Sequence, residues 1–330
     1  MAYVIKSFTG LMQADAGAEF GAFVTNLPQV VAWQALFMAI TIYIVYKGIG
    51  GGIEKYCRVL MPALFVLLLI LIVRSVTLPG AGEGINFYLK PDFSKLTGGA
   101  LGAALGQAFF SLSLGMGCII TYGSYLGKKE TLPGAAMQVC FLDTMVAFLA
   151  GLVIFPAVFA FGVEPGAGPG LTFITLPNVF GQMPGGAIWS AMFFVLLFVA
   201  ALTSAISLLE VVSAYFIDEM KWSRPKASWI MGIVIFLLGI PSAMGIAGII
   251  PKLAGRDFLD SADFLASNVL LPLGGFFIAL FVGWFWTEGA KQEEENNGTA
   301  PFGLYTAWLW VCRVVAPLAI AYIFITGLKW

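Results

Sequence analysis

Eight apolar runs dominate this sequence, and most reach the roughly 20 residues that a helix needs to cross a bilayer. They lie at about 30–47, 57–78, 99–126, 134–161, 188–216, 226–246, 262–287 and 302–328. A shorter apolar piece at 1–12 is too brief to cross alone. Only 11% of the residues are charged, against about 25% in soluble domains. The predicted fold is therefore an all-α, polytopic membrane helix bundle, with 1–330 forming a single transmembrane domain.

The third run contains a predicted interruption. Residues 106–117 read Gly-Gln-Ala-Phe-Phe-Ser-Leu-Ser-Leu-Gly-Met-Gly. Gly115 and Gly117 disfavour a helix, while Ser111 and Ser113 compete for backbone hydrogen bonds. Irregular backbone is tolerated at membrane depth only where protein shields it or where it lines a wet cavity. Interrupted helices near the midplane are typical of the binding sites of membrane transporters.

Other breaks in the pattern are weaker. Pro62, inside the second run, removes an intrahelical hydrogen bond and predicts a kink or local unwinding there. Turns or loops are predicted at the Gly/Pro-rich stretches 79–82, 165–170 and 183–186.

Composition excludes several classes of function. The net charge of −1 argues against a nucleic-acid partner. The chain has no histidine, so it lacks the usual general base and the commonest metal ligand. Its four cysteines form no Cys-x-x-Cys pair, which leaves neither a disulfide framework nor a zinc site indicated. An enzyme is not expected; an intramembrane enzyme would have to rely on Asp143 and Glu210 as acid and base.

Asp143 is the most unusual charged residue in the sequence. It lies nine residues into its run, which is about 13 Å along a helix and well inside the hydrocarbon. A carboxylate there costs several kcal/mol unless it is paired, protonated or bound to a cation. Asp143 is thus either a partnered carboxylate that stabilises the bundle or part of a functional site.

Thr203 and Ser204 lie near the centre of the fifth run, beside Ala200. Small and hydroxyl residues in membrane helices usually allow close packing or bond back to the preceding turn. Their oxygens are also suitable ligands for a small hard cation, provided that other oxygens converge on the same point. The spacing alone leaves both interpretations open.

The predicted break offers a second set of polar groups. Ser111 and Ser113 flank freed backbone amides and carbonyls, which suit the two charges of a zwitterion. Phe109, Phe110 and Met116 are candidates for an apolar wall beside it. Asp218 and Asp263 stand near the ends of their runs, where a solvated helix end is the simpler interpretation.

Taken together, these residues resemble the neurotransmitter:sodium symporter family, in its bacterial branch. The runs that carry the resemblance, in chain order, lie at 47–62, 84–93, 106–125, 172–177 and 202–204. The resemblance implies a leucine-transporter-like fold and sodium-coupled symport of amino acids or related amines by alternating access. It also implies a multi-pass protein of the bacterial inner membrane, with sodium ions and a small-molecule substrate as ligands and a homodimer as a possible assembly.

The resemblance also assigns roles to particular residues. It makes Ala200, Thr203 and Ser204 sodium ligands, with Ser111 at another sodium. The implied substrate pocket is lined by Phe110, Ser111, Ser113, Met116, Ser204 and Leu208. Gln107 and Asp143 fall where chloride-dependent members hold chloride and where chloride-independent members carry a carboxylate, so chloride dependence stays open. Asp263 matches an outer gate, and Asp218 with Tyr125 matches an inner gate.

The sequence departs from the family pattern at its N-terminus. Family members begin with two further spans and most of a third, which supply additional sodium and substrate ligands. The stretch 2–6 resembles the outer end of that third helix. We therefore expect a truncated product with impaired transport. The alternative is a non-transporting membrane scaffold or partner subunit.

Overall fold

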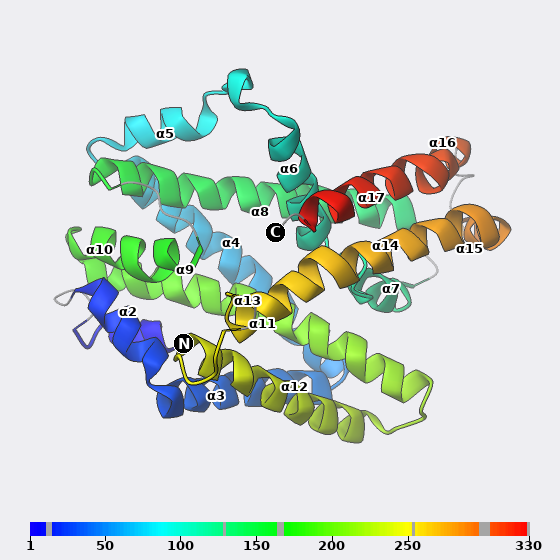
Figure 1. The fold of residues 1–330 in the computed structure, drawn as a ribbon, viewed down its shortest axis with the longest axis horizontal. Coiled ribbons are helices and arrows are strands. Elements are labelled where there is room, and N and C mark those ends of the chain that lie inside the picture. The colour runs from blue at the N-terminus through cyan, green and yellow to red at the C-terminus, as the bar shows by residue number, and fades with distance from the viewer. Residues whose placement is uncertain (11–14, 128–129, 164–167, 253–254, 297–303, 329–330) are drawn as a thin grey trace. The chain divides into compact units, whose positions relative to one another are not determined.

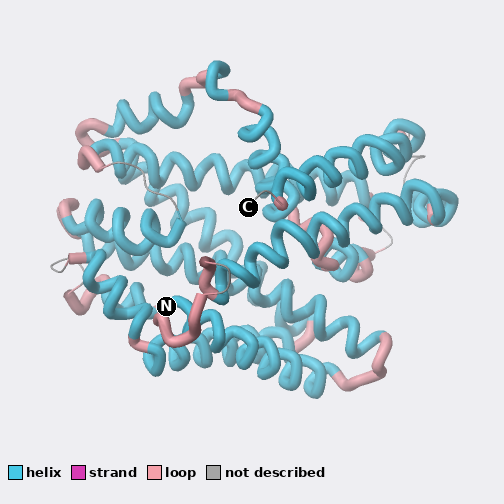
Figure 2. The backbone as a smooth tube through the Cα atoms, in the orientation of Figure 1, coloured by secondary structure: helices cyan, strands magenta, loops and turns pink. Residues whose placement is uncertain are grey.

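A computed structural model describes residues 1–10, 15–127, 130–163, 168–252, 255–296 and 304–328. All regular structure in these ranges is helical, and no strand occurs among them (Figure 2). The chain divides into two compact units, residues 1–91 with 146–259 and residues 92–145 with 260–330. Each unit is described by itself, and the predicted single transmembrane domain stays a prediction.

Figure 1 labels most helices of the first unit. They are α1 (Ala2–Lys6), α2 (Ala16–Thr25), α3 (Leu27–Tyr46), the π-helical turn η1 (Ile49–Glu54), α4 (Lys55–Val76), α5 (Ala81–Leu89), α9 (Gly168–Gly170), η3 (Leu171–Thr175), α10 (Leu176–Gly181), α11 (Gly186–Asp218) and α12 (Arg224–Ile246). Two further helices, α8 (Leu132–Ala160) and α13 (Phe258–Phe264), each contribute residues to both units.

Helix α11 is the centre of the first unit. It packs against α1, α3, α4, α10 and α12, and α3 and α12 lie side by side beneath it (Figure 1). In the most hydrophobic 18-residue window of α11, 39% of the residues are buried, against 11–22% in the other spans. An apolar helix buried on several sides belongs in the core of a bundle. The hydroxyl pair of Thr203 and Ser204 therefore stands on the best-supported helix of this unit.

Hydroxyl hydrogen bonds link helices of this unit at buried positions. Ser75 on α4 donates to the carbonyl oxygen of Val153 on α8 at 2.7 Å. The hydroxyl oxygens of Ser7 and Ser190 lie 2.8 Å apart and join the N-terminal segment to α11. In membrane proteins such bonds average about 0.6 kcal/mol and add to the close packing of small residues.

The second unit is built around three helices. Its elements are η2 (Phe93–Lys95), α6 (Gly98–Ser111), α7 (Cys118–Gly123), η4 (Leu265–Leu270), α14 (Leu271–Leu280), η5 (Phe281–Phe285), α15 (Thr287–Asn296), α16 (Tyr305–Trp310), η6 (Val311–Val315) and α17 (Ala316–Gly327). α17 packs against both α6 and α14. The Tyr322 hydroxyl donates to the carbonyl oxygen of Gly98 at 2.9 Å, which fixes α17 against the start of α6.

Two π-helical turns of this unit, η5 and η6, face each other. A π turn leaves backbone groups outside the regular ladder, and these need other partners in a membrane. Arg313 on η6 supplies one, since its Nε donates to the carbonyl oxygen of Gly283 on η5 at 2.6 Å. Its guanidinium carbon also lies 5.4 Å from the Trp284 ring centroid. The Arg313 guanidinium thus has a hydrogen-bond acceptor and an aromatic ring as partners within the protein.

Seven of the eight predicted spans form helices long and apolar enough to cross a membrane, counted over the described residues. They are Leu27–Tyr46, Ile49–Val76, Leu132–Ala160, Gly186–Asp218, Arg224–Ile246, Phe258–Phe285 and Tyr305–Gly327. The predicted all-α membrane bundle is confirmed. In the described part of the apolar piece at 1–12, residues 1–10, the regular structure is the short helix α1.

The eighth predicted span, 99–126, is interrupted as the sequence indicates. α6 ends at Ser111 and α7 begins at Cys118. Between them Ser113, Gly115 and Gly117 have φ values of 56°, 77° and 82°, all in the left-handed region. Only glycine adopts this region without cost, so Ser113 is held there by its surroundings.

Direct backbone contact with α14 holds this interruption in place. A Cβ atom on Gly115 would lie 2.2 Å from the carbonyl oxygen of Leu271. One on Gly274 would lie 2.5 Å from the carbonyl oxygen of Gly115, and one on Gly275 would lie 2.2 Å from the Phe109 ring. Glycines at these three positions let the broken segment and α14 approach more closely than side chains would allow.

The prediction of local unwinding at Pro62 is wrong. α4 continues as an α-helix through that residue. The irregularity instead precedes α4, where Gly48 has a φ of 84° and η1 follows. Gly52 determines where η1 lies, since a Cβ atom on Gly52 would be 2.1 Å from the carbonyl oxygen of Ile44. The turn is therefore set by the close approach of η1 to α3.

Two of the three predicted turns are confirmed. Gly80 and Gly185 are left-handed residues that begin α5 and α11. In the third stretch, 165–167 lie outside the described residues. Gly168–Gly170 form a helical turn that continues into η3 and α10, so the predicted loop is wrong at those positions.

We predict that Gly115→Ala destabilises the chain by roughly 2 kcal/mol or more, because it combines a strained φ with a backbone clash. Gly123→Ala is the matched control, since a Cβ at that helical position meets no atom within 4 Å. Its effect should stay within about 1 kcal/mol. Thermal unfolding in detergent measures both, and equal effects would contradict the packing described for the break.

Candidate functional site

Ser111, the last residue of α6, is bonded to the intramembrane carboxylate. Its Oγ lies 2.6 Å from both Oδ1 and Oδ2 of Asp143 on α8. Both residues belong to the second unit, and the contact is partly buried. Hydrogen bonds to a charged acceptor are short and contribute about 1.5–3 kcal/mol. Asp143 is thus a partnered carboxylate, and its partner stands at the edge of the break.

Three oxygens gather on one turn of α11 in the first unit. The Thr203 Oγ1 donates to the carbonyl oxygen of Ala200 at 2.9 Å, and the Ser204 Oγ donates to the same oxygen at 3.2 Å. Thr203 also lies 3.2 Å from the carbonyl oxygen of Val199. This back-bonding is what the packing interpretation predicts. It also leaves the hydroxyl lone pairs available as hard oxygen ligands.

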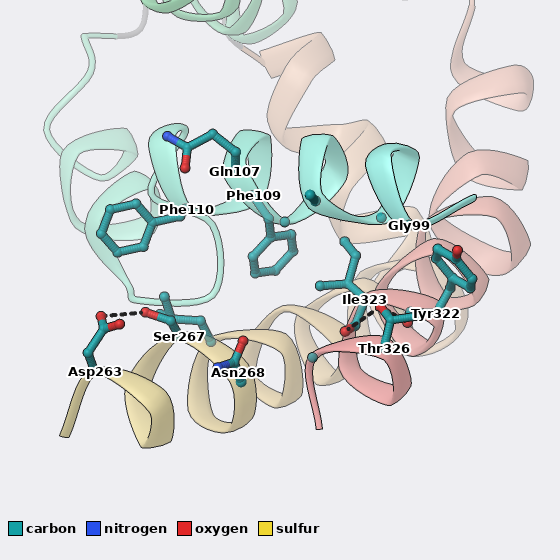
Figure 3. A pocket seen from close by; sticks show the side chains of 15 residues that line it. Gly99, Gln107, Phe109, Phe110, Asp263, Ser267, Asn268, Tyr322, Ile323 and Thr326 are labelled. Carbon is teal, nitrogen blue, oxygen red and sulfur yellow. Dashed lines mark hydrogen bonds between the residues drawn. The ribbon is translucent and has the colours of Figure 1, made fainter. Parts of the chain in front are cut away.

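A cavity of about 680 Å³ lies within the second unit (Figure 3). Its walls come from α6, from the α13–α14 region and from α17. Phe109 and Phe110 extend from α6 toward α13 and α14, and the Ser267 Oγ donates to Asp263 Oδ1 at 3.0 Å on the facing side (Figure 3). The wall provided by α6 is glycine-rich, with Gly99, Gly102 and Gly106 leaving space beside Tyr322 and Thr326. The cavity is therefore an apolar space with a few polar groups on its walls, as small-molecule sites are.

The predicted site residues divide between the two units. Gln107, Phe110 and Asp263 line this cavity. Ser111, Ser113 and Met116 lie at the end of α6 or in the break itself and are not among the residues that line it. Ala200, Thr203, Ser204 and Leu208 share α11 in the first unit, and the Leu208 side chain is exposed.

The predicted gate residues are placed as follows. Asp263 is exposed near the end of α13. Asp218 is the last residue of α11, and Lys221 bonds to its backbone carbonyl. Tyr125 follows α7 in the second unit, where its ring packs edge-on against Tyr122 at 6.2 Å. Asp218 and Tyr125 belong to different units, so their pairing stays a prediction.

Sequence reasoning missed a buried ion pair in the first unit. Glu210, fully buried on α11, accepts two hydrogen bonds from Arg224 at the start of α12, at 2.8 and 3.0 Å. This paired-fork geometry is the strong form of a carboxylate–arginine contact. The sequence shows both residues, but they stand 14 positions apart and no periodic signal indicates that they meet. The pair fixes the end of α11 that carries Asp218.

The polar residues of the cavity wall were also missed. Asn268 and Ser267 lie on the π turn η4, and Tyr322 and Thr326 lie on α17. All four lie in apolar runs, where a packing role is the ordinary expectation for a polar residue. The only available signal was the adjacent Ser-Asn pair near the start of the seventh run.

A membrane bundle with an interrupted helix, whose broken end carries polar side chains, has the architecture of ion-coupled transporters. A family model described as the sodium:neurotransmitter symporter family matches residues 21–329, and the chain belongs to that family. This confirms the family resemblance seen in the sequence and makes the chain part of a multi-pass, sodium-coupled symporter family.

Individual relatives agree with this assignment. The chain is 42% identical over 330 residues to "Uncharacterized sodium-dependent transporter YhdH" of Bacillus subtilis, covering 98% of this chain and 73% of that protein. It is 41% identical to an uncharacterized sodium-dependent transporter of Haemophilus influenzae, covering 91% of this chain and 66% of the relative.

Among solved structures, the chain is similar to MhsT, crystallised in complex with L-phenylalanine. The TM-score is 0.87 at 46% sequence identity, over 98% of this chain and 75% of the MhsT chain. At this level of similarity the fold is shared, and the predicted leucine-transporter-like fold class is confirmed.

We predict that Ser111→Ala and Asp143→Asn are coupled. Each removes the same charge-assisted hydrogen bond, so the double variant should lose about 1–2 kcal/mol less than the sum of the single losses. Chemical unfolding of the four proteins measures the coupling. Thr144→Ala, which removes a neighbouring hydroxyl bonded to the Cys140 carbonyl at 2.8 Å, should show none with Ser111→Ala. Strictly additive losses for Ser111 and Asp143 would contradict the bond.

Proposed function

We propose that this chain forms the part of a sodium-coupled amino-acid symporter that carries the oxygen cluster of Ala200, Thr203 and Ser204. Family membership supports sodium coupling. The substrate class follows from MhsT, a relative of the same fold crystallised with L-phenylalanine. The single observation that carries the proposal is the convergence of three oxygens on one turn of α11.

The spacing of these oxygens suits a small cation. Hard cations take oxygen ligands at about 2.3–2.6 Å, which places neighbouring ligand oxygens roughly 3 to 3.6 Å apart. The Thr203 and Ser204 hydroxyl oxygens lie 2.9 and 3.2 Å from the Ala200 carbonyl oxygen. On binding, the hydroxyls turn their lone pairs to sodium and release the carbonyl, so little rearrangement is needed.

Ser111 and Asp143 form a second sodium-binding position in this proposal. Ser111 is a sodium ligand at the edge of the break. The Asp143 carboxylate accepts the hydrogen bond of the Ser111 hydroxyl and so orients the hydroxyl lone pairs toward the ion. The fixed negative charge of Asp143 replaces the negative charge that chloride supplies in other family members. The substrate zwitterion then meets backbone groups of 115–117, which follow the hydrogen-bonded amides of 112–114. Phe110, Ser113 and Met116 are its proposed contacts around the break, and Ser204 and Leu208 are its proposed contacts on α11.

Sodium drives alternating access through differential affinity. A bound ion shifts a conformational equilibrium only by as much as it prefers one state over the other. In this proposal, sodium prefers the substrate-loaded closed state, because its oxygen ligands are fully engaged only there. Asp263 at one end and Asp218 with Tyr125 at the other then close the pathway in turn.

The test is sodium-dependent binding of radiolabelled L-phenylalanine to purified protein. It uses the chain itself and the chain joined to the N-terminal segment of the Bacillus subtilis relative, because the family resemblance predicts further ligands there. We expect binding that rises with sodium and not with potassium in the joined protein. Binding indifferent to sodium would contradict the symporter; absence of binding in both proteins would favour a scaffold or partner subunit.

We predict that Thr203→Ala raises the sodium concentration for half-maximal binding about tenfold, which corresponds to about 1.4 kcal/mol for one lost oxygen ligand. Ser204→Ala should act in the same direction. Thr41→Ala is the control, because its hydroxyl also bonds back to a helix carbonyl in the first unit, at 3.0 Å. If the Thr203 and Thr41 variants shift equally, the Thr203 oxygen is not a sodium ligand.

We predict that Asp143→Ser makes binding depend on chloride, since it removes the fixed negative charge beside Ser111. Binding by the original chain should be equal in chloride and gluconate, whereas the variant should lose most of its binding in gluconate. Asp263→Ser, which removes a carboxylate elsewhere in the same unit, should not produce this dependence. A variant at Asp143 that binds equally in both anions would remove the carboxylate from the sodium site.

A further inference from the structure

A shallow groove of about 380 Å³ lies in the first unit, away from every residue discussed for sodium and substrate. It runs over α4 and the start of α11, and it is lined by Leu69, Ile70, Val73, Arg74, Thr77 and Trp189. Leu69, Ile70 and Val73 lie on one face of α4 and are exposed. On a membrane-spanning helix, such a face meets acyl chains.

A cation and an indole ring close one end of this groove. Arg74 lies in the last turn of α4, and Trp189 lies in the first turn of α11, so both stand where a spanning helix reaches the membrane–water interface. The Arg74 guanidinium carbon is 5.6 Å from the centroid of the Trp189 ring. The indole is itself held, since its Nε1 donates to the carbonyl oxygen of Pro184 at 3.1 Å.

The charge of Arg74 is not matched by an acid within the described residues, where no carboxylate forms an ion pair with it. Thr77 offers no donor to a ligand, because its hydroxyl bonds to the carbonyl oxygens of Val73 and Arg74 at 2.8 and 3.1 Å. A favourable interaction of Arg74 with the α4 helix dipole accounts for a cation in the last turn. It does not account for the apolar groove beneath it or for the fixed indole beside it.

We propose that this groove binds an anionic phospholipid. One acyl chain lies along Leu69, Ile70 and Val73, and the phosphate meets the Arg74 guanidinium at the level of Trp189. Basic sites next to membrane helices attract anionic headgroups, and a guanidinium bonds phosphate through two parallel N–H groups. A zwitterionic headgroup gains less, since it brings its own cation to Arg74.

Trp189 makes the proposal measurable by fluorescence. The protein is placed in phosphatidylcholine nanodiscs that contain an equal fraction of either dibrominated phosphatidylglycerol or dibrominated phosphatidylcholine, whose bromines quench nearby tryptophans. The chain has nine tryptophans, so the Trp189 signal is taken as the difference between the chain and its Trp189→Phe variant. We expect about fivefold enrichment of the anionic lipid at Trp189, the preference that one basic residue near a membrane surface supplies.

Variants at Arg74 separate headgroup recognition from general lipid contact. Arg74→Gln should abolish the preference for the anionic lipid, while Arg74→Lys should retain most of it. Arg58→Gln is the matched control, because Arg58 is an exposed arginine near the other end of α4 that pairs with Glu54. This variant should leave the Trp189 signal unchanged.

Three results would overturn the proposal. Equal quenching by both lipids would show that the groove takes any acyl chain. Absence of quenching by either would show that protein covers the groove. An equal loss of preference in Arg58→Gln and Arg74→Gln would assign the effect to overall charge. The groove shares no residue with the sodium and substrate site, so failure here leaves the proposed transport function standing.

Discussion

The backbone contact between the interrupted segment and α14 is the constraint on which the candidate site depends. A membrane helix that stops at Ser111 and resumes at Cys118 exposes backbone groups that lipid cannot satisfy. The Leu271 carbonyl oxygen approaches Gly115, and the Gly115 carbonyl oxygen approaches Gly274, more closely than a Cβ atom would allow. Gly275 likewise leaves room for the Phe109 ring. The half-buried break thus packs against protein along the side that faces α14.

This contact with α14 also places the polar groups at the break. Ser111 ends α6 where its hydroxyl reaches Asp143, and the carboxylate is thereby partnered at a depth where a free charge would cost several kcal/mol. On the other unit, α11 is the most buried span, so the oxygens of Ala200, Thr203 and Ser204 stand on a rigid support. Each unit therefore carries its own cluster of oxygens on a well-packed helix.

The sequence predicted the elements better than their contacts. Long apolar runs are the strongest sequence signal in a membrane protein, so seven spans and the interruption of the eighth were predicted within a few residues. The carboxylate at 143 was recognised from its depth, but not its partner, because Ser111 and Asp143 lie on different helices. Glu210 and Arg224 were missed for the same reason. The unwinding predicted at Pro62 is absent, since α4 continues as an α-helix through that residue. The irregular turn forms at η1, where Gly52 packs on Ile44.

The most direct test of this account is hydrogen–deuterium exchange of the amides between Ser111 and Cys118, resolved by mass spectrometry in nanodiscs. An interrupted helix predicts that the amides of Gly115, Met116 and Gly117 exchange much faster than those in the middle of α6 and α8. Protection as complete at 115–117 as within α6 would show a continuous helix. That result would contradict the break and, with it, the site built on it.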